Sequence, residues 1–171
     1  MSLLDLIKED FESHGRDWTR PGFRALAVYR FGVWRMGVGP KVVRAPLSVA
    51  YRFMFRHVRN HYGIELPYSA TVGRKVVFEH QGGIVIHGAA VIGDGSYIRQ
   101  GVTLGNRSLN EPHNAPVLGK NVNVGAGAKL LGKVHVGDGA AIGANAVVLE
   151  DVPPGATVVG IPARIVGAKS K

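Results

Sequence analysis

An aliphatic residue recurs at every sixth position through much of the second half of the chain. Glycine directly follows four of the six members of the central run, and a second column of small or aliphatic residues stands four positions further on. A period of six is too short for a pair of helices. It predicts a solenoid of short strands with a corner in every hexapeptide and three hexapeptides in each coil. The two columns are Leu118, Val124, Leu130, Val136, Ile142 and Val148, and Val122, Ala128, Val134, Ala140, Ala146 and Val152.

The repeat extends upstream but is interrupted twice. Phe78 and Ile86 are eight residues apart instead of six, and Leu104 and Leu118 are fourteen apart instead of twelve. Each interruption is therefore expected to add two residues to the repeat. Because a regular solenoid mainly builds a surface, function is expected at the interruptions. The upstream members are Ile86, Ile92, Ile98 and Leu104, with Val72 and Phe78 in a shifted phase.

Residues 1–62 follow a helical pattern instead. Apolar side chains at helical spacing predict one helix near the start, a second after the Pro21-Gly22 turn, and a third over residues 45–58. We therefore expect a mainly β protein with a basic α-helical region at 1–62, a β-solenoid at 63–167 and a short tail at 168–171.

The amino-acid composition argues against disulfide-stapled, cysteine-dependent and membrane-spanning proteins. The 171 residues include 24 glycines, about twice ordinary usage, and no cysteine. Without cysteine there is no disulfide framework, no thiolate nucleophile and no Cys-ligated zinc. No apolar run approaches the ~18 residues of a membrane-spanning helix, and the start shows no signal-peptide pattern. A cytoplasmic protein, soluble or peripheral to a membrane, is the expectation.

The positive charge is concentrated in the helical region. The net charge is +9, and residues 18–64 hold nine basic side chains and no acidic one. This stretch fits a helical cap that packs on the solenoid or on another subunit, which we favour. It also fits an interfacial helix on an anionic membrane. Nucleic acid is not expected as a partner, because no recognised reading motif is present.

Several segments resemble motifs of the hexapeptide-repeat acyltransferases, and among these the serine acetyltransferase group. The resemblance runs from about Gly63 to Gly167. It implies a left-handed parallel β-helix, a homotrimer with its site between neighbouring subunits, and acetyl transfer from acetyl-CoA to a hydroxyl. The segments are Phe-Glu-His-Gln-Gly-Gly-Ile-Val-Ile (78–86), Gln-Gly-Val-Thr-Leu-Gly (100–105), Gly-Ala-Gly-Ala-Lys (125–129), Val-Pro-Pro-Gly (152–155) and Gly-Ile-Pro-Ala-Arg (160–164).

The resemblance also assigns a catalytic group. The family's catalytic histidine falls on His80, its orienting aspartate on Glu65, and the aspartate beside the histidine on Glu79, so both carboxylates are kept on longer side chains. The chemistry is coherent, because an alcohol needs a general base to attack a thioester near neutral pH. Histidine suits that role, and a carboxylate can fix its tautomer and stabilise the imidazolium.

Further positions are assigned to acetyl-CoA and to the reaction's oxyanion. Ala126 and Ala144 match the small residues along which CoA runs, one coil apart, and Arg164 matches a basic position near the CoA phosphate. A backbone N–H near Gly105 or Asn106 is a candidate donor to the tetrahedral oxyanion.

The acceptor stays open between L-serine and a sugar. His113 lies near the family's acceptor-contacting histidine, and Asn106 and Arg107 begin the same loop. That loop lacks the Gly-Gly-Thr-Gly and Arg-His-Pro of serine acetyltransferases. A loop starting Gly-Asn-Arg, together with basic helices, also resembles the polysaccharide-locus acetyltransferases, which modify sugars of lipid-linked anionic precursors. In that case the basic helices would contact the lipid-linked substrate or the membrane.

A scaffold, or a solenoid with a three-histidine metal site like the carbonic anhydrases of this fold, is a different class of function. The histidines here show no zinc spacing, so no metal is expected.

Overall fold

The computed structural model describes residues 2–166, and the expected tail at 168–171 lies outside them. Three helices come first: α1 (Leu3–Ser13), α2 (Pro21–Met36) and α3 (Lys41–Tyr62). They correspond to the three predicted helices, but α3 is longer at both ends than the pattern indicated. Ser2 caps α1 through its hydroxyl, and Gly63 ends α3 in the left-handed conformation. None of these helices is long and apolar enough to cross a membrane.

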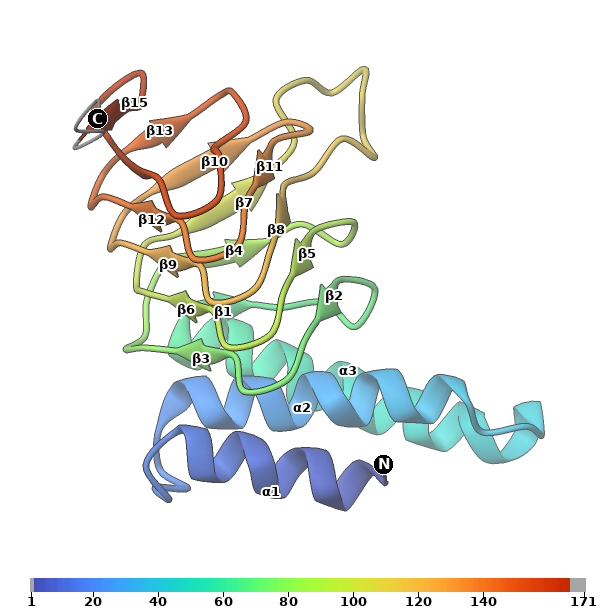
Figure 1. Ribbon diagram of the computed structural model, residues 1–171. Coiled ribbons are helices and arrows are strands. Elements are labelled where there is room, and N and C mark those ends of the chain that lie inside the picture. The colour runs from blue at the N-terminus through green and yellow to red at the C-terminus, as the bar shows by residue number, and fades with distance from the viewer. Residues whose placement is uncertain (1, 167–171) are drawn as a thin grey trace.

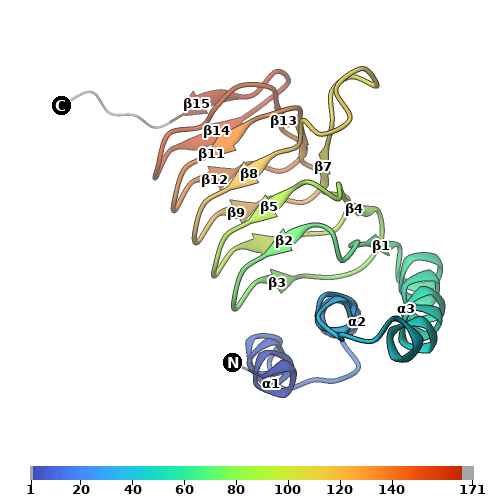
Figure 2. The ribbon, with the colours of Figure 1, turned by 90° about the vertical axis from the view of Figure 1, so that its right-hand side faces the viewer.

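Very short strands follow and form three sheets. Successive strands pass from one sheet to the next in turn, so the chain coils around three faces, and its neighbours within each sheet are parallel except for the last pair (Figures 1 and 2). The sheet orders are β1-β4-β7-β10-β13, β11-β8-β5-β2 and β15-β14-β12-β9-β6-β3. The strands are β1 (Ile64–Glu65), β2 (Thr71–Val72), β3 (Val77–Phe78), β4 (Ile84–Ile86), β5 (Val91–Ile92), β6 (Tyr97–Ile98), β7 (Thr103–Gly105), β8 (Val117–Leu118), β9 (Asn123–Val124), β10 (Lys129–Leu131), β11 (His135–Val136), β12 (Ala141–Ile142), β13 (Val147–Val148), β14 (Thr157–Val159) and β15 (Arg164–Val166).

The aliphatic columns fill the interior of the coil, as predicted. Every member of the first column and of the small second column is buried. Parallel register stacks like on like: Leu104 pairs with Leu130, and Leu130 with Val148. The coil therefore buries apolar area in stacked layers of similar aliphatic side chains, which is the usual source of stability in solenoids.

The second interruption differs from the prediction. β7 and β8 are consecutive strands on adjacent faces, so the fourteen residues from Leu104 to Leu118 replace one hexapeptide and not two. Leu104 accordingly pairs with a residue 26 positions later, whereas Val124 pairs with Ile142, 18 later. The interruption thus adds eight residues, not two. Counting in sixes could not distinguish the two cases, since both leave the same phase.

The helices cover the lower edge of the first coil (Figure 2). The exposed edge of a sheet carries unpaired backbone groups that need partners. The Tyr29 hydroxyl donates to Ala70 O (2.8 Å) and accepts from Val72 N–H (3.0 Å), and Arg30 donates to the carbonyls of Val72 (2.9 Å) and Gly73 (2.6 Å). Arg30 also forms a buried ion pair with Asp10 at 2.8 Å. Side chains of α2 therefore complete the hydrogen bonding of the first coil.

Candidate active site

His80 occupies the corner between β3 and β4, at the first interruption. Its backbone has a φ of +66°, an uncommon conformation for a residue with a side chain, and the side chain is exposed. Backbone hydrogen bonds hold the corner on both sides: Gly82 N–H donates to Tyr62 O, and Gly101 N–H donates to Gly82 O, both at 2.8 Å. The corner is thus fixed while the imidazole faces solvent.

A pocket of about 310 Å³ opens beside this histidine, between the corner and the beginning of α2. Gly22 packs so closely on β3 that a Cβ there would come within 1.9 Å of Phe78 O. Only glycine allows α2 to begin at this distance. The pocket is lined by Arg20, Pro21, Gly22, Phe78, Glu79 and His80.

Sequence reasoning assigned Glu79 and His80 to the site and missed the pocket wall that α2 supplies. The Arg-Pro-Gly triplet at 20–22 indicated only a turn before a helix. Its contact with a strand more than fifty residues later depends on tertiary packing, which no local signal reveals.

The two candidate carboxylates lie in different surroundings. Glu79 forms an ion pair with Arg99, 3.1 Å between Oε2 and Nε, with both side chains about one third exposed. Glu65 is half-buried in β1, in register with Val85 of β4. Within residues 2–166, neither carboxylate is hydrogen-bonded or ion-paired to the His80 ring. The structure thus joins Glu79 to Arg99, a partner that sequence reasoning did not identify.

The small residues assigned to CoA stand on the edge of the coil that also carries His80. The corner of His80 is followed, coil by coil, by the corners at 99–102, 125–128 and 143–146, all between the same two sheets. Gly127 N–H donates to Gln100 O and Asn145 N–H donates to Ala126 O, each at 2.8 Å. Ala126 and Ala144 therefore belong to stacked corners above His80, with Ala144 exposed.

Arg164 is the first residue of β15, which lies at the end of the coil opposite the helices (Figure 2). β15 runs antiparallel to β14, and Ala163 N–H donates to Val147 O at 2.8 Å. The Arg164 side chain is exposed. The segment at 160–164 therefore lies next to the last corner of the edge that begins at His80.

The residues assigned to the acceptor and oxyanion lie at the other end of the same face. Gly105 ends β7, and the loop at 106–116 leads from there to the neighbouring sheet, projecting from the coil (Figure 1). Asn106 Nδ2 donates to Ser108 O at 2.9 Å, and both Arg107 and His113 are exposed. The parallel strands of the sheet β1-β4-β7-β10-β13 all run from the edge that carries His80 toward the edge that carries the loop at 106–116. Within one chain, the residues assigned to the acceptor and oxyanion therefore lie apart from His80.

No cluster of three or more His, Asp or Glu side chains suited to a metal ion occurs among residues 2–166.

Known proteins share both the repeat and the fold. The family model "bacterial transferase hexapeptide (six repeats)" matches residues 115–150. The serine acetyltransferase of Salmonella typhimurium is 41% identical over 146 residues, which are 85% of this chain and 51% of that protein. The chain thus spans about half the length of this curated relative.

Two solved structures extend the likeness to nearly the whole chain. Soybean serine acetyltransferase, as apoenzyme, superposes with a TM-score of 0.81 at 32% identity, over 96% of this chain and 69% of that one. A serine acetyltransferase in complex with CoA gives a TM-score of 0.79 at 32% identity, over 96% and 70%. On this agreement of repeat, sequence and fold, the chain belongs to the serine acetyltransferase family.

Proposed function

We propose that this chain is an O-acetyltransferase that moves the acetyl group of acetyl-CoA to a hydroxyl, with L-serine as the acceptor. One observation carries the proposal. The histidine that matches the family's catalytic base is exposed, lines a pocket and sits on a fixed corner at an unusual backbone angle. Such a conformation also occurs at other corners of the coil, at Lys75, Asn121 and Asn145, and it is retained where the surrounding structure holds it.

In the proposed reaction the His80 imidazole takes the proton of the acceptor hydroxyl as its oxygen attacks the thioester carbonyl. The tetrahedral intermediate collapses, the carbon–sulfur bond breaks, and the imidazolium returns its proton to the departing thiolate of CoA. The products are an acetyl ester and free CoA. A histidine is suited to both steps because it accepts and returns a proton near neutral pH.

The carboxylates are proposed to support this histidine rather than to react. Glu65 would orient the imidazole, as a carboxylate does in other histidine-based sites. Glu79, held beside the corner by Arg99 and lining the same pocket as His80, would help to position the ring. Both are positioning roles.

The separation of the two groups of residues supports a site that is completed by a neighbouring subunit. We propose a homotrimer of left-handed coils in which the His80 edge of one chain faces the loop edge of the next. Acetyl-CoA would run along the corners of Ala126 and Ala144, with Arg164 near its phosphate. Gly105 and Asn106 of the adjacent chain would supply the oxyanion donor, a type of contribution that is usually large.

A sugar hydroxyl is the second candidate acceptor, and the loop at 106–116 favours it. The loop carries Arg107 and His113 in an arrangement unlike that of serine acetyltransferases, and acceptor contacts are assigned to it. The discriminating experiment measures thiol release from acetyl-CoA with L-serine and, separately, with a panel of sugars and nucleotide sugars. Turnover with serine supports the first acceptor. Turnover with a sugar and none with serine would replace it.

A further inference from the structure

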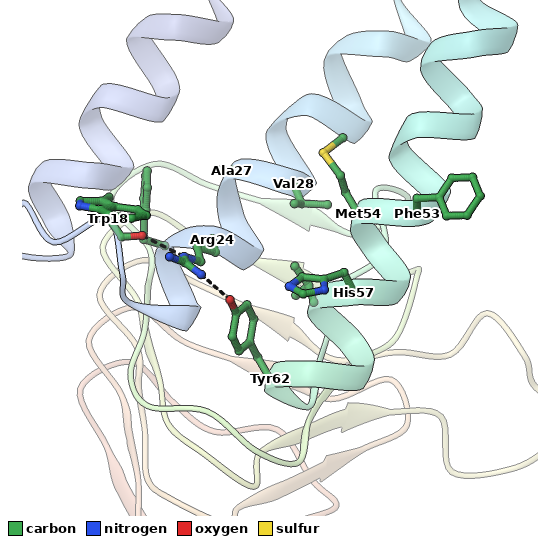
Figure 3. A pocket seen from close by; sticks show the side chains of 10 residues that line it. Trp18, Arg24, Ala27, Val28, Phe53, Met54, His57 and Tyr62 are labelled. Carbon is green, nitrogen blue, oxygen red and sulfur yellow. Dashed lines mark hydrogen bonds between the residues drawn. The ribbon is translucent and has the colours of Figure 1, made fainter.

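A second pocket, of about 580 Å³, lies between α2 and α3 and shares no lining residue with the His80 pocket (Figure 3). Its volume is in the range of ligand-binding cavities. Its walls are mainly apolar and include Trp18, Ala27, Val28, Phe53, Met54 and Tyr62. The proposed acetyl transfer uses none of these side chains.

Arg24 places a fixed positive charge in this apolar pocket. Its guanidinium donates to Tyr62 Oη at 2.5 Å and to Trp18 O at 3.0 Å, and lies 5.1 Å from the centre of the Trp18 ring (Figure 3). Within residues 2–166 no carboxylate forms an ion pair with it. The side chain is thus held in place by neutral groups, and the nearby Asp17 carboxylate is bound to Thr19 and ion-paired with Arg20, so the Arg24 charge is available to an anion.

The outer rim of the pocket adds more positive charge beside an exposed aromatic ring. Phe53, which is 67% exposed, also lines an adjoining hollow together with Val49, Arg52 and Arg56. Both arginines are exposed, and in the described part of the chain neither forms an ion pair or a side-chain hydrogen bond. No acidic residue occurs between positions 18 and 64 to offset them.

We propose that this surface, defined by the pocket and by Phe53, Arg52 and Arg56, binds anionic phospholipid at a membrane surface. Phe53 and the apolar pocket would take up acyl chain, and the three arginines would face the lipid phosphates. Helices that combine arginines with exposed aromatic and aliphatic side chains bind bilayers in this way.

Charge complementarity favours anionic phospholipid over a second copy of the chain as the group that covers this surface. The three-fold contacts proposed above use the His80 edge and the loop edge of the coil, not this face. A two-fold contact between trimers through this face would bring the same patch against itself, so Arg52 and Arg56 would meet like charges. An anionic lipid surface instead supplies the missing negative charge over the whole patch. The inference goes beyond the acetyl transfer and does not depend on it.

The test is co-sedimentation of the full chain with vesicles of phosphatidylcholine alone or of phosphatidylcholine mixed with phosphatidylglycerol. We expect binding to the mixed vesicles at low salt, release as salt is raised, and little binding to the neutral vesicles. The double variant R52Q/R56Q should bind the mixed vesicles more than tenfold more weakly, because each arginine near an anionic surface contributes about fivefold. K120Q/K133Q, which changes two exposed lysines of the coil, is the matched control and should bind like the wild type.

Phe53→Ala tests the apolar part, with Leu4→Ser as a control at an exposed apolar residue of α1. The first should weaken binding about tenfold, and the second should leave it unchanged. Circular dichroism and thermal unfolding check that each variant is folded. Absence of binding to mixed vesicles at low salt, or equal binding by R52Q/R56Q and wild type, overturns the proposal. So does a fall in the oligomeric mass of Phe53→Ala, which would make this face an interface between copies.

Discussion

The ring of His14 in α1 accepts a hydrogen bond from the backbone N–H of Phe78, 3.3 Å from its Nε2 and two residues before His80. Its Nδ1 lies 2.7 Å from Asp10 O, a group that can only accept, so Nδ1 carries the proton and Nε2 is free to accept. This neutral ring thus joins α1 to the strand that leads into the active-site corner.

The stability of the fold should therefore fall in mild acid. Burial lowers the pKa of His14 below its ordinary value of about 6.5, against the smaller, opposite effects of the Asp10 carbonyl and carboxylate. Because the pKa of His14 is lower in the folded than in the unfolded chain, the unfolded chain takes up the proton first as the pH falls. The contribution of neutral His14 to the free energy of unfolding is therefore complete above about pH 6.5 and is lost as the pH falls below it. Urea unfolding at pH 7.5 and 5.5 measures the loss. The loss of unfolding free energy between these two pH values should be smaller in His14→Gln than in the wild type. An identical pH dependence in the variant and the wild type would contradict this role for His14.

Removing the Asp10 carboxylate should destabilise the fold strongly. Asp10→Asn leaves the buried Arg30 guanidinium without its counter-charge, which typically costs about 3–5 kcal/mol. Glu9→Gln removes the carboxylate of a more exposed ion pair, with Arg74, and should cost less than about 1 kcal/mol. The free energy of unfolding of each variant decides the point. Equal losses of unfolding free energy in the two variants would show that the Asp10–Arg30 pair stabilises the fold no more than the Glu9–Arg74 pair does.

Gly22→Ala should displace α2 from the active-site corner. The added methyl group would meet Phe78 O and the Phe78 Cβ, and such overpacking typically costs about 1–3 kcal/mol. Gly39→Ala is the control, because a Cβ there meets nothing within 4 Å. Acetyl transfer and thermal unfolding are measured for both variants. We expect a lower melting temperature and lower activity in Gly22→Ala alone, and a wild-type result for it would show that the close approach is unimportant.

A site shared between subunits predicts complementation. His80→Ala and the double variant R107A/H113A should each have low activity, because each damages one half of every site. Mixed oligomers formed by refolding them together should regain about a quarter of wild-type activity, from sites that combine two intact halves. The check is activity of the co-refolded mixture against the separately refolded variants. No gain on mixing would mean that each chain carries a complete site.

Much of this fold was predictable from the sequence because its layers repeat. Inward positions such as Val124 and Ile142 stack on each other, so one constraint recurs in each coil and becomes visible as a period. The length of the loop at 106–116 was mispredicted because the repeat shows which positions face the interior, but not how many hexapeptides an interruption replaces. Two tertiary contacts of the site were not predictable for a different reason. Gly22 and Arg99 act through residues distant in sequence, and neither belongs to a repeating pattern.

The most direct test of the account compares kcat for acetyl-CoA-dependent thiol release, with the acceptor that the wild type uses, between wild type and His80→Ala. Removing a general base should lower kcat by about 10²-fold or more, while circular dichroism and oligomeric mass stay unchanged, because the His80 ring forms no hydrogen bond or ion pair within residues 2–166. Wild-type turnover in a folded His80→Ala protein would contradict the central claim that this histidine activates the acceptor hydroxyl.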